Sequence, residues 1–216
     1  MNNGMTGYNE QEVIQATNGI KAGIENYFGA TNTRLENDFV RPMENLWASE
    51  DARSYFESYE DAVRAQFQSD LESLNTIIEH FNSAAAKYAS ESGASYSPIN
   101  YDAPACDCDI SGIKTDIAGT RGINRTEAVE TAQVLNAIKE EAISALESIK
   151  SSASASGFYG EAMAHQEAID GSIENMKNRI SNLIDEMYSR VDQAIQATAD
   201  KYGNLEAEAA AAAAGN

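Results

Sequence analysis

The chain of 216 residues contains 34 Asp and Glu residues against 15 Lys and Arg residues, which gives a formal net charge of −19. This charge disfavours binding to nucleic acids and to anionic membranes, because each presents a negatively charged surface of its own. No apolar run in the sequence reaches the length of a membrane-spanning helix, so we expect no membrane insertion.

Four segments of the sequence place apolar residues three or four positions apart, at 13–47, 52–88, 128–153 and 162–205. Such steps keep the side chains on one side of a helix, so each segment is predicted to be an amphipathic helix. The first apolar stripe has one gap, near residue 31. We find no sustained alternation of apolar and polar residues, the pattern that predicts strands.

The starts of three helices are marked by cap residues. Asn9 precedes Glu12 by three positions, and Asn124 precedes Glu127 by the same spacing, so both pairs match a capping box. Ser49 is predicted to cap the second helix, where the acidic residues that follow it complement the positive end of the helix dipole.

Two short gaps that contain aromatic residues separate the helices within each half of the chain. The first gap holds the only tryptophan, Trp47, followed by Ala48 and Ser49, and the second reads Phe158-Tyr159-Gly160. Both follow the order aromatic, any residue, small residue: Trp47 and Ser49 in the first gap correspond to Phe158 and Gly160 in the second. Because so short a gap makes the flanking helices antiparallel neighbours, each half is predicted to be a helical hairpin.

A different composition marks residues 93–124, which hold two of the three prolines and both cysteines. This segment is predicted to be an irregular connector, with a short helical turn around Ile110, Ile113 and Ile117. Cys106 and Cys108 are interpreted as reduced thiols, since a zinc site would need further Cys or His ligands at a matching spacing.

The predicted fold is all-α, with two long helical hairpins packed as an antiparallel four-helix bundle, a pseudo-dimer within one chain. The first hairpin covers residues 9–92, the connector residues 93–124 and the second hairpin residues 125–206. Residues 207–216 form an alanine-rich tail, and the last apolar stripe is expected to include Leu205.

On the two gaps and the long helices that follow them, the chain resembles the WXG-motif family, the early-secreted-antigen-like substrates of type VII secretion. Ser49 stands where the family has glycine and Phe158 where it has tryptophan, and both keep the physical type of the residue. Members of this family are helical hairpins of about half this length that pair into four-helix bundles. The resemblance therefore implies two such hairpins fused in one chain, and export without a cleaved signal peptide.

The resemblance also implies an export signal of the form Tyr-x-x-x-Asp/Glu after the second helix of a hairpin. Tyr202 and Glu206 match this signal, and Tyr188 and Asp192 match it in an earlier register. In the family the signal is read by the type VII secretion ATPase, which is accordingly the expected partner.

No phosphate-binding loop, nucleophile elbow or metal-binding helix motif occurs in the sequence. We therefore expect no enzymatic activity, no cofactor and no metal site. The predicted function is that of a non-enzymatic helical-bundle protein, secreted or on the cell surface, which acts through protein–protein recognition. Its partners include the secretion ATPase, and either another helical-hairpin protein or a second copy of the chain. The alternative is a structural or adaptor module that holds another helical protein and has no role in secretion.

Overall fold

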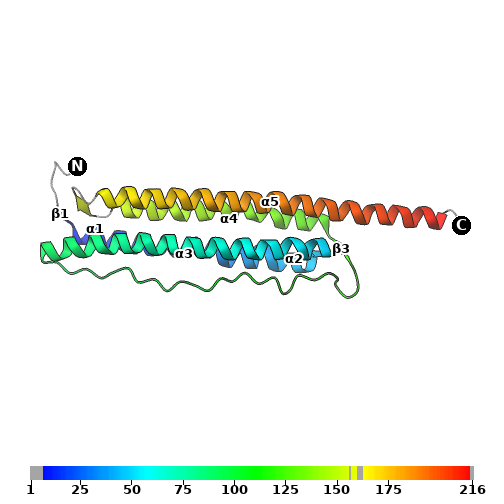
Figure 1. Ribbon diagram of the computed structural model, residues 1–216, viewed down its shortest axis with the longest axis horizontal. Helices are drawn as coiled ribbons and strands as arrows, with labels where there is room; N and C mark the ends of the chain where they lie inside the picture. The colour runs from blue at the N-terminus through cyan, green and yellow to red at the C-terminus, as the bar shows by residue number, and fades with distance from the viewer. Residues whose placement is uncertain (1–6, 156, 160–162, 215–216) are drawn as a thin grey trace. The chain divides into compact units, whose positions relative to one another are not determined.

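The computed structural model describes residues 7–155, 157–159 and 163–214, and its helices pack against one another as an all-α bundle (Figure 1). The prediction of an all-α fold is thus confirmed. The helical elements are α1 (Glu10–Phe28), the π-helix η1 (Gly29–Val40), α2 (Arg41–Leu46), α3 (Glu50–Ser92), α4 (Arg125–Ser154) and α5 (Met163–Ala214). Four strands of two residues each accompany them: β1 (Gly7–Tyr8), β2 (Trp47–Ala48), β3 (Gly122–Ile123) and β4 (Phe158–Tyr159).

The three predicted cap residues stand at the starts of α1, α3 and α4. The side-chain oxygen of each accepts a hydrogen bond from the backbone N–H three residues later, which satisfies a donor that the helix itself cannot pair. The bonds run from Glu12 N to Asn9 Oδ1 at 3.3 Å, from Ala52 N to Ser49 Oγ at 3.0 Å and from Glu127 N to Asn124 Oδ1 at 3.4 Å.

The gap in the first apolar stripe is the site of the π-helix. Every fourth residue from Ile20 to Val40 is buried, and the positions near the gap are taken by the polar residues Thr31, Asn32 and Glu36. An α-helix has about 3.6 residues per turn, so a steady step of four would drift off the buried side. The wider winding of a π-helix corrects this drift and keeps one side of the helix buried.

The chain divides into two compact units. The first contains Met1–Thr31, Gln66–Ala105 and Lys139–Ser181, and the second contains Asn32–Ala65, Cys106–Ile138 and Asn182–Asn216. The long helices α3, α4 and α5 each contribute residues to both units, and each unit has its own apolar core. Fully buried core residues of the first unit include Ile20, Ile24, Leu74 and Phe81, and those of the second include Phe39, Met43, Phe56 and Leu135.

In the first unit, α1 and α4 approach closely at two glycines. A Cβ atom built on Gly19 would lie 2.3 Å from the Oγ atom of Ser152. One built on Gly23 would lie 2.5 Å from the Cγ1 atom of Ile149. A side chain at either position would therefore force Ser152 or Ile149 to shift, so glycine allows this close contact between the two helices.

The connector is more ordered than the sequence indicates. The predicted helical turn is present at its start, where Ile113 N donates to Ile110 O at 3.0 Å and both side chains are buried. Ile117 does not belong to it: this residue is 36% exposed and forms a tight turn with Thr120 through backbone bonds of 2.8 and 2.9 Å. Gly119, within that turn, has a φ of 80°.

The C-terminal part of α5 continues as helix beyond the predicted hairpin. The prediction that Leu205 belongs to the core is wrong, because its side chain is 51% exposed. From Gly203 to Ala214 every residue of the helix is exposed. Alanine favours helix strongly even without tertiary contacts, which explains why the helical conformation extends past the last buried turn.

Candidate functional site

The first aromatic gap, at the end of α2, is a two-residue strand. In the second unit, β2 pairs antiparallel with β3, so that Trp47 lies opposite Ile123 and Ala48 opposite Gly122. Beside this pair, Asn124 N donates to Leu46 O at 2.8 Å. The gap is therefore fixed to the residues that lead into α4.

Trp47, a residue of this strand pair, is fully buried. Its ring centroid lies 6.1 Å from that of Tyr55 and 6.3 Å from that of Phe56. Among the described residues, its Nε1 atom is buried without a hydrogen-bond partner. The predicted turn residue is thus a core residue of the second unit, and Ser49, only 2% exposed, caps the helix that follows.

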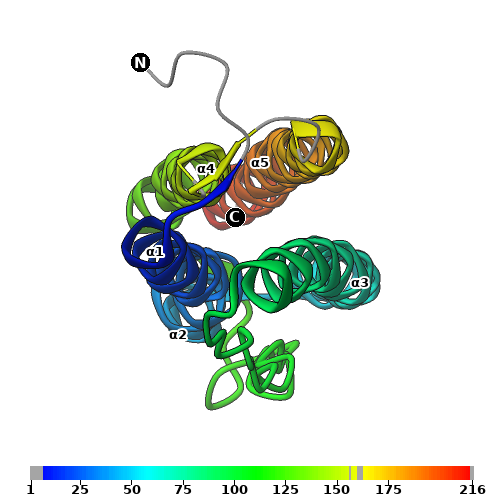
Figure 2. The same cartoon turned by 90° about the vertical axis from the view of Figure 1, so that its left-hand side faces the viewer.

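The second aromatic gap repeats this arrangement in the first unit. There β4 pairs antiparallel with β1, with Phe158 opposite Tyr8 and Tyr159 opposite Gly7 (Figure 2). Asn9 N donates to Gly157 O at 3.0 Å. The side chain of Phe158 and the whole of Gly160 lie outside the described residues, so the predicted roles of these two remain predictions.

The two strand pairs have the same register. Trp47 and Phe158 occupy equivalent positions, and Ile123 is equivalent to Tyr8. In both pairs the residue before the gap accepts a hydrogen bond from a helix-capping asparagine, Asn124 in one and Asn9 in the other. Two-residue strands carry no sequence period, so only the matching order aromatic, any, small in the two gaps indicated the equivalence.

The candidate export signals lie on α5 within the second unit. Tyr202 is half-buried and Glu206 is exposed, whereas in the earlier register Tyr188 is half-buried and Asp192 is exposed. Lys201, next to Tyr202, forms an ion pair of 3.7 Å with Asp51 in the first turn of α3. The later candidate therefore stands close to the helix that Ser49 caps.

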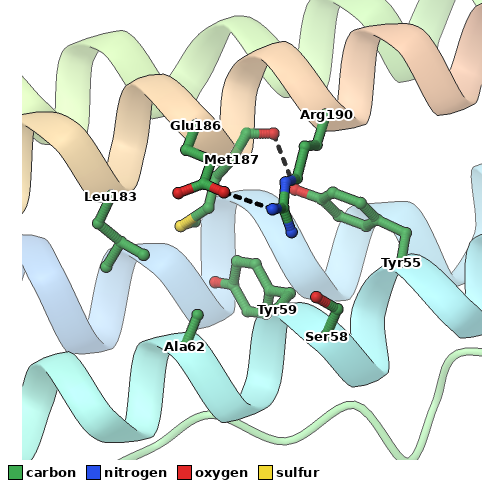
Figure 3. A pocket seen from close by; sticks show the side chains of 8 residues that line it. All are labelled: Tyr55, Ser58, Tyr59, Ala62, Leu183, Glu186, Met187 and Arg190. Atoms are coloured by element: carbon green, nitrogen blue, oxygen red, sulfur yellow. Dashed lines mark hydrogen bonds and ion pairs between the residues drawn. The ribbon is translucent and has the colours of Figure 1, made fainter.

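A small groove separates α3 from α5 in the second unit (Figure 3). Its volume is about 60 Å³, and Tyr55 closes one side by donating from its hydroxyl to Met187 O at 3.1 Å. Burial raises the pKa of Tyr55 well above its usual range, and the Arg190 guanidinium lowers that pKa by a smaller amount. Arg190 pairs with Glu186, one turn earlier on α5, at 2.5 Å, and both side chains line the groove. The groove is too small for a drug-sized ligand.

A buried polar cluster in the first unit was not predicted from the sequence. Asp70 is 2% exposed and accepts hydrogen bonds from the Tyr27 hydroxyl and from Gln66 Nε2, the latter at 2.7 Å. Arg179 of α5 donates to Asp70 at 3.2 Å and to Ser73 Oγ at 2.9 Å. Burial raises the pKa of Asp70, although the hydrogen bonds to its carboxylate offset part of that effect. The cluster joins α1, α3 and α5.

The described residues contain no group of three or more His, Cys, Asp or Glu side chains placed to hold a metal ion. Within the same part of the chain, no helix combines the length and the hydropathy needed to cross a membrane. Comparisons with protein-family models, with curated proteins and with solved structures give no match in any of the three. The function must therefore be argued from the chain itself.

Proposed function

We propose that the protein is a non-enzymatic helical bundle that acts through protein–protein recognition, as a type VII secretion substrate built of two fused hairpins. The observation that carries this proposal is the repeated turn. The Trp47 gap and the Phe158 gap form strand pairs of the same register, each with a hydrogen bond from a capping asparagine. The presence of the same turn in both halves of the chain favours two copies of one hairpin.

The pairing pattern supports a pseudo-dimer. In each unit the gap of one half of the chain pairs with the residues that lead into the first helix of the other half. This reciprocity is the property of a two-fold, isologous interface. In the first unit Gly19 lies against Ser152 and Gly23 lies against Ile149. Residue numbers therefore rise along α1 in the direction in which they fall along α4. That order favours the antiparallel four-helix arrangement.

The export signal is assigned to Tyr202 and Glu206. Glu206 belongs to the exposed end of α5, where a partner protein has free access, and Tyr202 precedes it by one turn. Lys201 and Asp51 tie this part of α5 to the helix after the Trp47 gap. The secretion ATPase is the proposed reader of this surface, and the proposed location is outside the cell or on its surface.

Export from the native host tests the assignment. Deletion of residues 200–216, and the double substitution Tyr202→Ala with Glu206→Ala, are expected to abolish export without unfolding the bundle. Circular dichroism should show an unchanged helical spectrum for the double substitution, and for the deletion a loss no larger than the removed end of α5 accounts for. The matched control is Tyr188→Ala with Asp192→Ala, the same pair of changes in the earlier register, and export of that variant is expected to continue. Normal export of the deletion variant would exclude a type VII signal at this end.

Cross-linking tests the pseudo-dimer separately. In a chain with Cys106→Ala and Cys108→Ala, the changes Ala48→Cys and Gly122→Cys place two thiols opposite each other in the β2–β3 pair. We expect a disulfide within one chain, which leaves a monomer on a non-reducing gel. Cross-linked dimers would show instead that the halves pair between two copies, as an adaptor that binds itself would do. Ala48→Cys alone is the control for random cross-linking.

A further inference from the structure

Residues 106–110 of the connector alternate in burial, as they would in an extended chain. Cys106 is half-buried, Cys108 and Ile110 are buried, and Asp107 and Asp109 between them are exposed. Side chains two residues apart in an extended segment lie on the same side. Both thiols therefore face the helices of the second unit, although no sustained alternation was found in the sequence and these cysteines were interpreted as loop residues.

Three side chains hold the backbone of this segment in place. Asn32 Oδ1 accepts from Asp107 N at 2.7 Å, and Glu36 Oε2 accepts from Asp109 N at 3.2 Å. Arg64 Nη2 donates to Cys108 O at 2.6 Å. Asn32 and Glu36 are themselves buried residues of the π-helix. The two cysteines thus sit on a segment whose position is fixed by the fold.

The spacing favours a bridging ion over a disulfide. With a rise of about 3.3 Å per residue, the Cα atoms of two residues two positions apart are separated by about 6.6 Å. That is close to the upper limit of about 6.8 Å for a disulfide, whose usual Cα separation is about 5.5–6 Å. Closing one would shorten the segment and strain the bonds to Asn32, Glu36 and Arg64.

A two-coordinate metal ion can bind both sulfurs with less displacement of the backbone than a disulfide requires. A metal–sulfur bond is about 2.3 Å long, so two sulfurs on opposite sides of one ion are about 4.6 Å apart. The two side chains need to lean toward each other by only about 2 Å in total to bring the sulfurs from the Cα separation of about 6.6 Å to this distance. The backbone then keeps its hydrogen bonds.

The neighbouring oxygen atoms have other partners. Asp107 Oδ2 accepts from Asn32 Nδ2 at 3.0 Å, and Asp109 Oδ1 accepts from Ser111 N at 2.9 Å. The site therefore offers two sulfur donors. It suits Cu(I), which binds two soft ligands, better than Zn(II), which takes four ligands.

We propose that Cys106 and Cys108 form a two-thiolate site for Cu(I), or a soft monovalent ion of the same kind. The ion forms two metal–sulfur bonds, and the thiol protons pass to the buffer. The resulting unit carries one negative charge and lies beside the Arg64 guanidinium, which donates to Cys108 O and also pairs with Glu60 at 2.8 Å.

Titration of the reduced, full-length chain with Cu(I), supplied as its bathocuproine disulfonate complex, tests this site. We expect the chain to withdraw one Cu(I) ion, with two sulfur neighbours in the copper X-ray absorption spectrum. Cys106→Ser and Cys108→Ser should each weaken binding at least about 100-fold, since loss of mere supporting contacts already costs about 10–100-fold. Arg64→Gln should weaken it by about 10-fold, and the control Asp102→Asn, an exposed acid of the same connector, should not change it.

Cys108→Ala provides a second variant if Cys108→Ser disturbs the buried site, with circular dichroism to check folding. The proposal is overturned if the chain leaves Cu(I) with the competitor, if one ion binds two chains, or if either single cysteine variant keeps the wild-type affinity. Treatment of the metal-free chain with glutathione disulfide tests the geometric argument on its own. Ready formation of a Cys106–Cys108 disulfide in the folded chain, seen as a mass lower by two hydrogens, would contradict that argument.

Discussion

The contact between α3 and α5 has a different chemistry in each unit. In the first unit it is polar: Asp70 and Ser73 of α3 bind Arg179 of α5, and the Asp70 carboxylate is almost fully buried. In the second unit it is aromatic on the α3 side, where Tyr55 donates one hydrogen bond to the backbone of Met187. The same two helices thus use a buried charge in one place and ring packing in the other.

The aromatic cluster of the second unit consists of Phe39, Trp47, Tyr55, Phe56 and Tyr59. Their ring centroids lie between 5.0 Å, for Tyr55 and Phe56, and 6.3 Å, for Trp47 and Phe56. Several pairs are tilted or edge-to-face, which the charge distribution of aromatic rings favours. Such packing buries much apolar area and contributes strongly to stability, but a shifted neighbour can still be accommodated at modest cost.

The buried Asp70 of the first unit works in the opposite way. A charge taken out of water gains little net stability even when it is paired, because its desolvation offsets the attraction. Any shift of α5 along α3, however, would leave the Asp70 carboxylate buried without its cation, which costs several kcal/mol. We infer that the aromatic cluster supplies stability and that the Asp70 cluster sets the register of α5.

The largest effect is expected at the centre of the aromatic cluster. Trp47→Ala should lower the free energy of unfolding by about 4 kcal/mol, because it removes a fully buried side chain and leaves a cavity. Urea denaturation followed by circular dichroism measures the change. Ile14→Ala is the control, since Ile14 is 50% exposed and its loss should cost under about 0.5 kcal/mol. A loss below about 1 kcal/mol at Trp47 would mean that the cluster is not the main source of stability.

A smaller effect is expected when the cation of the polar cluster is removed. Arg179→Met keeps the apolar stem but leaves Asp70 buried beside no positive charge, which should cost about 3 kcal/mol. The double variant Asp70→Leu with Arg179→Met should be more stable than Arg179→Met alone, because it removes the stranded charge as well. Additive losses in this double-mutant cycle would show that the two side chains are not coupled.

The sequence predicted the helices and their starts because both depend on local pattern. Apolar residues at steps of three and four identified the helical segments, and Asn9, Ser49 and Asn124 marked where helices begin. The strand pairs could not be predicted in the same way, since two residues are too few to show a period. What the sequence did offer was the likeness of the Trp47 and Phe158 gaps.

The polar residues of the core were missed because their partners are distant in sequence. Leu71 is an apolar residue of the predicted helical segment 52–88, yet it is only half-buried, and Asp70 beside it is the buried residue. A carboxylate is placed inside only when donors meet it there, and Tyr27 and Arg179 come from two other helices. For the same reason the buried Asn32 was read as part of the gap in the stripe near residue 31.

The pH dependence of stability further distinguishes the Asp70 cluster from the aromatic cluster. Burial raises the pKa of Asp70 in the folded chain, whereas an unfolded Asp has a pKa of about 3.9. Between these two values the folded chain holds a proton that the unfolded chain has lost, so stability falls as pH rises. The contribution of Asp70 is therefore complete below about pH 4 and is lost as the pH passes the folded pKa.

Urea unfolding of the wild type and of Asp70→Asn between pH 4 and pH 7.5 measures this effect. The asparagine does not titrate, so the difference between the two chains isolates Asp70 from the other carboxylates. The wild type is expected to lose stability relative to Asp70→Asn as the pH rises. A relative gain with rising pH would mean that Arg179 and Tyr27 stabilise the carboxylate by more than burial destabilises it.

The smallest effects come from one chemical change made in both units. Tyr55→Phe removes a neutral hydrogen bond to a backbone carbonyl and should cost about 1 kcal/mol. Tyr27→Phe removes a hydrogen bond to a buried carboxylate and should cost about 2 kcal/mol, since bonds to charged groups are stronger. Both hydroxyls are replaced by the same hydrogen, so differences in side-chain entropy and shape cancel, and urea denaturation reports the difference in hydrogen-bond chemistry. If Tyr55→Phe cost as much as Tyr27→Phe, the hydrogen bond to the buried Asp70 carboxylate would be no stronger than the one to a backbone carbonyl. The inference that the Asp70 cluster sets the register of α5 would then be wrong.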